Sequence, residues 1–444
     1  MPALTDLIRT EAIRNFFKVF FSSLVAQAIS FALSPVLSRL FTPEDFGLVA
    51  LYLGILSLLS VLSTGKYEQA IMLPKEDRDA VQLVWLVLLI TGAAAMLTGL
   101  VVTLFKVPLT NLSGNQSLGP WLYALPFSVL LHGIYQSAVF YANRKKRFGL
   151  MGKGTLVQYG VLNLVRILSG WIKTSFNGLI AGHLAAQLAA AAFVLRGVIK
   201  DLLAFQKGSN IRTILKQGGI YDQYPKYNLV LSFTNNLSGS LPVFLFTWGF
   251  SPAIAGLYAF GYAFVFRPLS LFAQSTTQVL SQKIIEDHHG GLDVYPTLKK
   301  LATRFLLFGL PAFIVLAIAA PAIFGFVFSV EYARAGSFLQ ILSPYLLMVF
   351  ITSPLSFVPE LYFRQRKAMT IDIIYLCLRF LALWTGIRIG DVQLALGLFS
   401  AISTLVVSYN LFWYLSMARH GGQGKPGRRR TSVKGAALGP KNSR

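Results

Sequence analysis

Residues 39–80 read RLFTPEDFGLVALYLGILSLLSVLSTGKYEQAIMLPKEDRDA, a polar turn followed by a long apolar run. The run covers residues 46–73, and only Lys66 and Glu68 interrupt its 28 otherwise uncharged residues. As one helix it would measure about 42 Å, more than the ~30 Å hydrocarbon core of a bilayer. The stretch therefore predicts a membrane-spanning helix with Lys66 near one boundary, where a long stem lets the ammonium group reach water.

The positions of Lys66 and Glu68 bear on whether the two charges pair. Successive residues of a continuous helix turn by about 100°, so these two side chains would point about 200° apart. We therefore expect no ion pair between them, with Lys66 facing either water or a cavity and Glu68 facing a neighbouring helix.

Runs of this kind recur along all 444 residues, of which 55% are hydrophobic and only 13% charged. We count twelve of them, which predicts an all-α polytopic membrane protein of about twelve transmembrane helices. The predicted division is an N-terminal tail (1–15), six spans (16–198), a linker (199–225), six further spans (226–416) and a basic, disordered tail (417–444).

The net charge of +23 follows from topology and does not indicate a nucleic-acid partner. Of the 40 Lys and Arg residues, 31 lie in loops and tails on one side of the predicted spans and 5 on the other. The positive-inside rule then places both termini in the cytoplasm. The single cysteine, Cys377, excludes an intrachain disulfide.

The two halves show a weak internal repeat. FTPEDFGL (41–48) and FSPAIAGL (250–257) each follow a span that contains proline, and they lie 209 residues apart. A duplicated six-span unit is a common transporter plan in which the substrate binds between the halves.

Charges deep in a membrane are costly and therefore need an explanation. Arg267 and Arg379 fall near mid-bilayer and Arg166 in the outer half, whereas Glu68 lies low in its span. A basic interior without a deep carboxylate favours an anionic solute, and arginine suits phosphate because its fork bonds two oxygens. The alternatives are that Arg267 serves a carbonyl freed by Pro268 and that Arg166 snorkels outward.

Polar residues form two stripes at helical spacing, Asn228, Ser232, Asn235 and Asn236 in the seventh span and Gln274, Gln278 and Gln282 in the eighth. Such stripes either hold helices together or line a wet cavity able to bind sugar hydroxyls. His132 and His183 are more typical of packing residues than of proton carriers. The sequence contains no P-loop, no zinc spacing and no nucleophile elbow, so we expect no catalytic site, cofactor or metal.

Residues 39–80, YDQYPKYNLVLSFTNNLSGSLPVFLF (221–246) and SPAIAGLYAFGYAFVFRPLSLFAQSTTQVLSQK (251–283) resemble bacterial polysaccharide-repeat-unit flippases, the Wzx-like lipopolysaccharide biosynthesis proteins. The resemblance covers most of residues 10–290. It implies the multidrug/oligosaccharidyl-lipid/polysaccharide exporter fold, in which two six-helix bundles surround a central cavity. Related sequences usually carry Arg-Tyr-Glu where this chain has Lys66, Tyr67 and Glu68, so the charge is kept without the bidentate fork.

The same resemblance implies a function and partners. An undecaprenyl-pyrophosphate-linked oligosaccharide would be moved from the inner to the outer leaflet of a bacterial cytoplasmic membrane, in concert with a polysaccharide polymerase and a chain-length regulator. The pyrophosphate would meet Arg267, Arg379, Arg166 and Lys66, the polar stripes would accept the glycan, and Glu68 would couple transport to a proton or sodium ion. The alternatives are a membrane-embedded polymerase or glycosyltransferase, which the short outer loops disfavour, and an exporter of another amphiphile.

Overall fold

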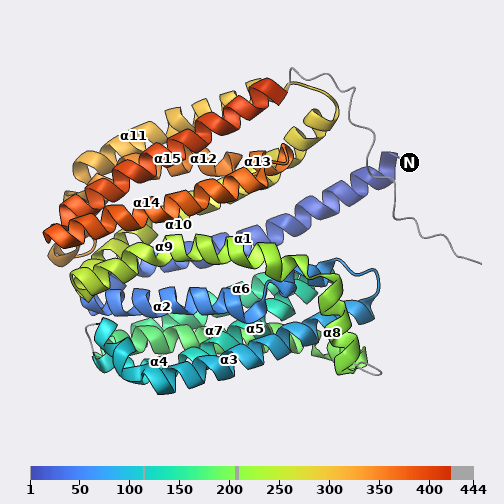
Figure 1. The fold of residues 1–444 in the computed structure, drawn as a ribbon, viewed down its shortest axis with the longest axis horizontal. Helices are drawn as coiled ribbons and strands as arrows, with labels where there is room; N and C mark the ends of the chain where they lie inside the picture. Colours follow the sequence, from blue (N-terminus) through green and yellow to red (C-terminus); the bar gives the residue numbers. More distant parts are fainter. Residues whose placement is uncertain (1, 114–115, 206–209, 422–444) are drawn as a thin grey trace, which may run out of the picture.

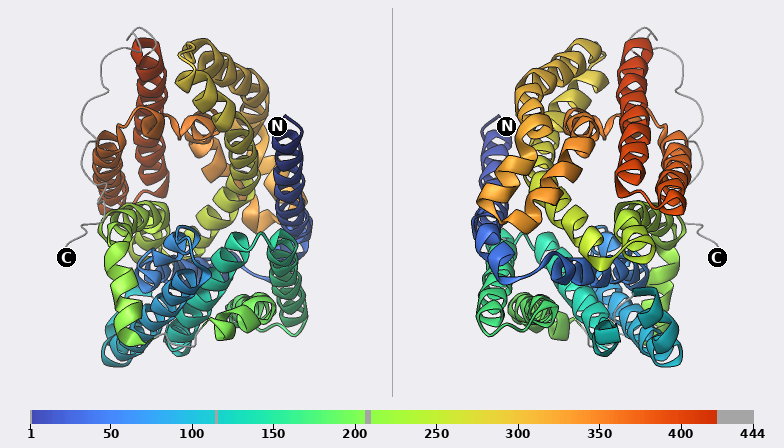
Figure 2. Two further views of the ribbon diagram at one scale, coloured as in Figure 1. Left: turned by 90° about the vertical axis from the view of Figure 1, so that its right-hand side faces the viewer. Right: turned by 90° about the vertical axis from the view of Figure 1, so that its left-hand side faces the viewer.

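The computed structural model describes residues 2–113, 116–205 and 210–421, and these residues form helices and no strands. The first lobe comprises α1 (Pro2–Leu40), α2 (Pro43–Thr64), η1 (Tyr67–Met72), α3 (Asp77–Ser113), η2 (Gln116–Leu118), α4 (Gly119–Leu122), α5 (Leu125–Arg144), α6 (Phe148–Trp171) and α7 (Phe176–Ala204). A short helix, α8 (Ile211–Ile220), follows. The second lobe comprises η3 (Tyr224–Asn228), α9 (Leu229–Gly249), α10 (Pro252–His289), α11 (Tyr295–Val327), η4 (Val330–Tyr332), α12 (Ala333–Thr352), η5 (Ser353–Leu355), α13 (Val358–Leu361), α14 (Gln365–Ile389) and α15 (Val392–Gly421). Figure 1 shows the lobes one above the other, and Figure 2 shows them from two ends.

The predicted fold class is confirmed. Within the described residues, eleven helices are long and apolar enough to cross a membrane. The predicted span at 149–172 is the 24-residue helix α6, which is not among those eleven. The helix α1 begins within the segment predicted as a tail, the predicted linker contains α8, and most of the tail predicted at 417–444 lies outside the described residues.

The two lobes approach each other most closely where α2 crosses α10, and the two copies of the sequence repeat make this crossing. A methyl carbon at Gly47 would lie 1.8 Å from the carbonyl oxygen of Pro252, and one at Gly256 would lie 1.8 Å from the carbonyl oxygen of Pro43. Each copy therefore places its glycine against the proline of the other. Only glycine allows backbones to come this close.

Local hydrogen bonds fix the start of α2 beside this crossing. The amide of Thr42 donates to Asp45 Oδ2 (2.9 Å), and the amide of Asp45 donates to the Thr42 hydroxyl (3.3 Å), which makes a capping box. Asp45 also accepts from the amide of Phe176 at the start of α7 (2.8 Å). Across the lobes, the Tyr332 hydroxyl donates to the carbonyl oxygen of Phe41 (2.8 Å). Hydrogen bonds therefore reinforce the glycine crossing at this end of the molecule.

The expectation of one continuous helix over residues 46–73 is wrong. The helix α2 ends at Thr64, Gly65 and Lys66 both adopt left-handed backbone (φ 57° and 62°), and a short 3₁₀ helix follows. The break turns the chain, and Lys66 Nζ lies 3.6 Å from Glu68 Oε1. The prediction that these two residues do not pair is therefore also wrong, because it assumed an unbroken helix.

The glycine crossing predicts that Gly256→Ala destabilises the fold, whereas Gly92→Ala in α3 does not. The first substitution forces a methyl group into backbone, an overpacking that costs about 1 to 3 kcal/mol or more. Nothing lies within 4 Å of the added methyl group at Gly92, so this matched control should be neutral or slightly stabilising. Thermal unfolding of the purified variants measures the difference, and equal midpoints would contradict the close crossing.

Candidate functional site

A cavity of about 790 Å³ lies between the two lobes. The first lobe supplies α1, α2, α6 and α7 to its wall, and the second lobe supplies α9 and α10. Its lining begins at Phe46, beside the glycine crossing. It extends to Leu24 of α1 and Leu271 of α10, which lie farther from that crossing. This volume is typical of a site for a small-molecule ligand.

Two of the predicted arginines line this cavity, one from each lobe. Arg166 lies on α6 and Arg267 on α10, close enough for their positive charges to repel each other. The stem of Arg166 passes over Gly182, where an added methyl carbon would lie 3.1 Å from Arg166 Cγ.

Neither arginine has a polar partner among the described residues. Arg166 Nε is buried without a hydrogen bond, and the exposed side chain of Arg267 makes no hydrogen bond or ion pair, including to a carbonyl freed by Pro268. None of the described residues that line the cavity is acidic. Two unpaired cations therefore share one cavity, an arrangement that an anion would stabilise.

A polar wall beside Arg166 was missed by the sequence analysis. Asn163 lines the cavity on the face of α6 that carries Tyr159 and Arg166, and its amide donates to the Ser30 hydroxyl (2.8 Å) and to the Tyr159 carbonyl oxygen (2.9 Å). Its Oδ1 remains without a partner. The spacing of residues 159, 163 and 166 at i, i+4 and i+7 was the signal available in the sequence.

Only part of the predicted polar stripes is found in the lining of the cavity. Asn235 and Asn236 of α9 line the cavity. Asn228 instead donates to Gln69 Oε1 (3.0 Å), and the carbonyl oxygen of Ser232 accepts from Asn236 (2.9 Å). The side chains of Gln274 and Gln278, and of Gln282 beyond them, lie outside the described part of the structure.

Arg379 does not lie in this cavity. It is 6% exposed inside the second lobe, where its five N–H donors make five hydrogen bonds. The acceptors are the carbonyl and hydroxyl oxygens of Ser238 and the hydroxyl groups of Tyr345, Tyr375 and Ser403. Its guanidinium also lies 4.0 Å from the Tyr375 ring centroid. All five N–H donors of Arg379 are therefore already bonded to protein groups, and none is left for a phosphate.

Lys66 and Glu68 lie outside the cavity lining, in the segment after α2. Glu68 is 4% exposed, and its Oε2 has no hydrogen-bond partner in the described part of the chain, although Oε1 faces Lys66. The neighbouring Tyr67 donates its hydroxyl to the carbonyl oxygen of Gly218 in α8 (3.1 Å). Burial, with a smaller contribution from Asp222, raises the pKa of Tyr67 and so keeps this donor protonated.

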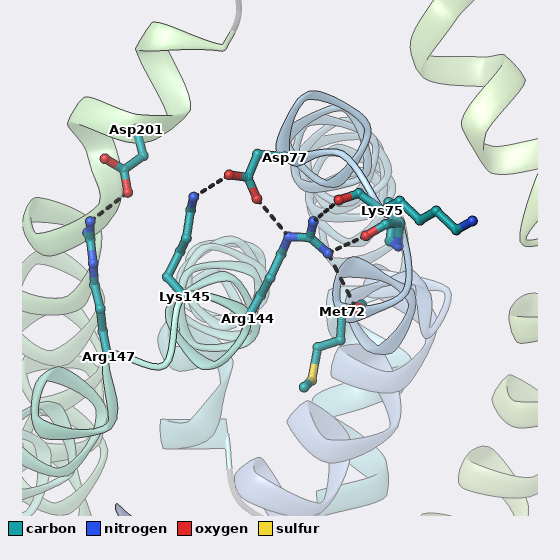
Figure 3. A network of polar contacts seen from close by, with 8 residues as sticks. Met72, Lys75, Asp77, Arg144, Lys145, Arg147 and Asp201 are labelled. Atoms are coloured by element: carbon teal, nitrogen blue, oxygen red, sulfur yellow. Dashed lines mark hydrogen bonds and ion pairs between the residues drawn. The ribbon is translucent and has the colours of Figure 1, made fainter. Parts of the chain in front are cut away.

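A charge network ties this segment to the end of α5, as Figure 3 shows. Arg144 donates to Asp77 Oδ1 (3.1 Å) and to the carbonyl oxygens of Pro74 (2.6 Å) and Lys75 (3.3 Å). Lys145 pairs with the other oxygen of Asp77. The chain between η1 and α3 is therefore held firmly at the end opposite the glycine crossing.

The described residues contain no group of three or more His, Cys, Asp or Glu that would hold a metal ion.

Comparison with solved structures defines the class of fold. An inward-facing multidrug resistance MATE family transporter of the MOP superfamily superposes with a TM-score of 0.66 at 12% identity, covering 89% of this chain and 95% of that one. The lipid II flippase MurJ, in an inward closed conformation, gives 0.66 at 14% identity over 90% of each chain. A mutant of the Vibrio cholerae MATE transporter VcmN gives 0.59 at 18% identity over 94% of this chain and 98% of that one. The chain therefore shares the fold of these MATE transporters and of the lipid II flippase.

The family follows from the sequence. A family model described as polysaccharide biosynthesis protein matches residues 36–337, and the chain belongs to this family. No curated protein matches the chain. The predicted family resemblance is confirmed.

The two arginine environments predict that substitution destabilises the fold at Arg379 and leaves its stability almost unchanged at Arg267. Arg379→Lys replaces a guanidinium fork by an ammonium group that cannot reach the same acceptors, which should cost about 3 kcal/mol. Arg267→Ala removes a side chain that has no polar partner in the described structure and should change stability by less than about 0.5 kcal/mol. Unfolding of the purified variants in detergent compares them, and equal destabilisation would contradict the assignment.

Proposed function

We propose that the protein flips an undecaprenyl-pyrophosphate-linked oligosaccharide, an O-antigen or exopolysaccharide repeat unit, from the inner to the outer leaflet of a bacterial cytoplasmic membrane. The observation that carries the proposal is a pair of arginines that have no polar partner among the described residues, in a cavity whose described lining contains no acidic residue. Membership of a polysaccharide biosynthesis family and the fold shared with the lipid II flippase MurJ support it. Both termini then lie in the cytoplasm, and a polymerase and a chain-length regulator act on the exported unit.

The charge of the substrate matches the charge of the site. A pyrophosphate diester carries about two negative charges, and Arg166 and Arg267 supply two positive ones from opposite lobes. Binding would relieve the repulsion between the two guanidinium groups and link the lobes through the ligand. Asn163, Asn235 and Asn236 then offer hydrogen-bonding groups to the glycan.

The apolar parts of the wall suit the lipid. Phe31 of α1 and Phe264 of α10 stack with ring centroids 4.2 Å apart at the seam between the lobes. The prenyl chain would leave the cavity along such a surface and remain in the hydrocarbon. An exporter of another anionic amphiphile is the second candidate, because the MATE relatives share the fold.

In the proposed transport cycle, the end of the protein at the glycine crossing is closed in this conformation. Neighbours described as inward-facing and inward closed support a state in which this end faces outward and is shut. Alternating access would part Gly47 from Pro252 and Gly256 from Pro43 while the opposite end closes.

Arg267→Ala should abolish export of polysaccharide while the protein still inserts into the membrane. Loss of one cationic fork weakens pyrophosphate binding by about 1.5 to 3 kcal/mol, or more than tenfold. Undecaprenyl-linked single repeat units should then accumulate on the inner leaflet. The matched control is Arg388→Ala at the end of α14, outside the cavity. Normal surface polysaccharide in the Arg267 variant would overturn the proposal, and accumulation of another amphiphile would favour the second candidate.

We propose that Glu68 couples transport to a proton or sodium gradient, because its carboxylate is buried and Oε2 has no hydrogen-bond partner among the described residues. In proteoliposomes, Glu68→Gln should bind substrate normally and flip it at a rate that no longer responds to either gradient. Glu331→Gln, an exposed carboxylate in η4, serves as control. A gradient response that survives in Glu68→Gln would exclude this residue.

A further inference from the structure

A second hollow, separate from the central cavity, opens between α14 and α15. It has a volume of about 460 Å³, and its walls include Lys367, Ile374, Leu405 and Tyr409. Neither α14 nor α15 contributes to the described lining of the central cavity. The groove is thus formed by the second lobe alone.

One end of the groove is cationic. The Lys367 ammonium lies 4.8 Å from the Trp413 ring centroid and 5.9 Å from that of Tyr409, so two aromatic rings hold it over the groove. Arg364 and Arg366 are exposed beside it, and none of the three cations forms an ion pair within the described residues. This end therefore has positive charge available for an external anion.

The rest of the groove is mostly apolar, with Thr370 as its other polar lining residue besides Tyr409, and it lies along helices that are long and apolar enough to cross a membrane. The membrane-capable helix α14 runs from Gln365 to Ile389, so Lys367 lies in its first turn and Ile374 lies about 10 Å farther along it. Ile374 is 53% exposed and Leu405 70% exposed, so both side chains face the surroundings of the lobe. Trp413 and Tyr409 are aromatic residues of the type that mark a membrane interface.

We propose that this groove binds one anionic phospholipid of the surrounding membrane. The phosphate would sit at Lys367 with Arg364 and Arg366 nearby, and an acyl chain would lie against Ile374 and Leu405. The cationic end of the groove suits an anionic headgroup, and its apolar part suits the acyl chain attached to that headgroup. This proposal does not depend on the proposed flippase activity. The bound lipid would fill the gap between α14 and α15 and support their packing.

Native mass spectrometry of the full chain tests the proposal with two lipids that share acyl chains, phosphatidylglycerol and zwitterionic phosphatidylcholine. The wild-type chain should retain one phosphatidylglycerol about fivefold more tightly than phosphatidylcholine. Lys367→Gln should remove this preference because the headgroup loses its cation. Leu405→Trp should lower retention of both lipids because the indole fills the groove.

Lys300→Gln, an exposed lysine near the start of α11, is the matched charge control and should behave as wild type. Equal binding of the two lipids by the wild-type chain, or an equal loss in Lys300→Gln, would overturn the proposal in favour of diffuse electrostatic attraction. Unchanged retention in Leu405→Trp would overturn it because the chain would then lie elsewhere. A dimer that dissociates in Lys367→Gln would instead make the groove a contact between two copies.

Discussion

The crossing of α2 and α10 at Gly47 and Gly256 is the contact on which the arrangement of the lobes depends. Each glycine lies against the carbonyl oxygen of the opposite proline, so any side chain there would separate the lobes. This contact closes one end of the space between them, and the lining of the cavity extends from Phe46 beside it to Leu24 of α1 and Leu271 of α10. The position of Arg166 relative to Arg267 follows, because their helices belong to lobes that meet at this point.

Features that depend on local sequence were predictable. The apolar runs correctly predicted the fold class, and the repeated proline and glycine pattern marked the two segments that cross each other in the structure. The repeat did not reveal that its copies touch each other. The cost of burying charge singled out Arg166 and Arg267, and the structure places both in one cavity. Depth alone could not show what either guanidinium contacts.

Features that depend on distant partners were not predictable. The sequence predicts Arg379 at the same depth as Arg267, but in the structure serine and tyrosine residues from α9, α12, α14 and α15 satisfy all its donors. Lys66 pairs with Glu68 because Gly65 and Lys66 break the helix, and only backbone conformation reveals this. In both cases the sequence supplied the correct type of residue, and the tertiary structure decided what it binds.

The central claim is that the two cavity arginines together hold a pyrophosphate. The most direct measurement is the affinity of the purified protein for a prenyl diphosphate compared with the matching prenyl monophosphate. The claim predicts that the wild-type protein prefers the diphosphate, that Arg166→Gln and Arg267→Gln each remove the preference, and that the double variant loses little more than either single one. Equal affinity for the two lipids, or a diphosphate preference retained by both single variants, would contradict it.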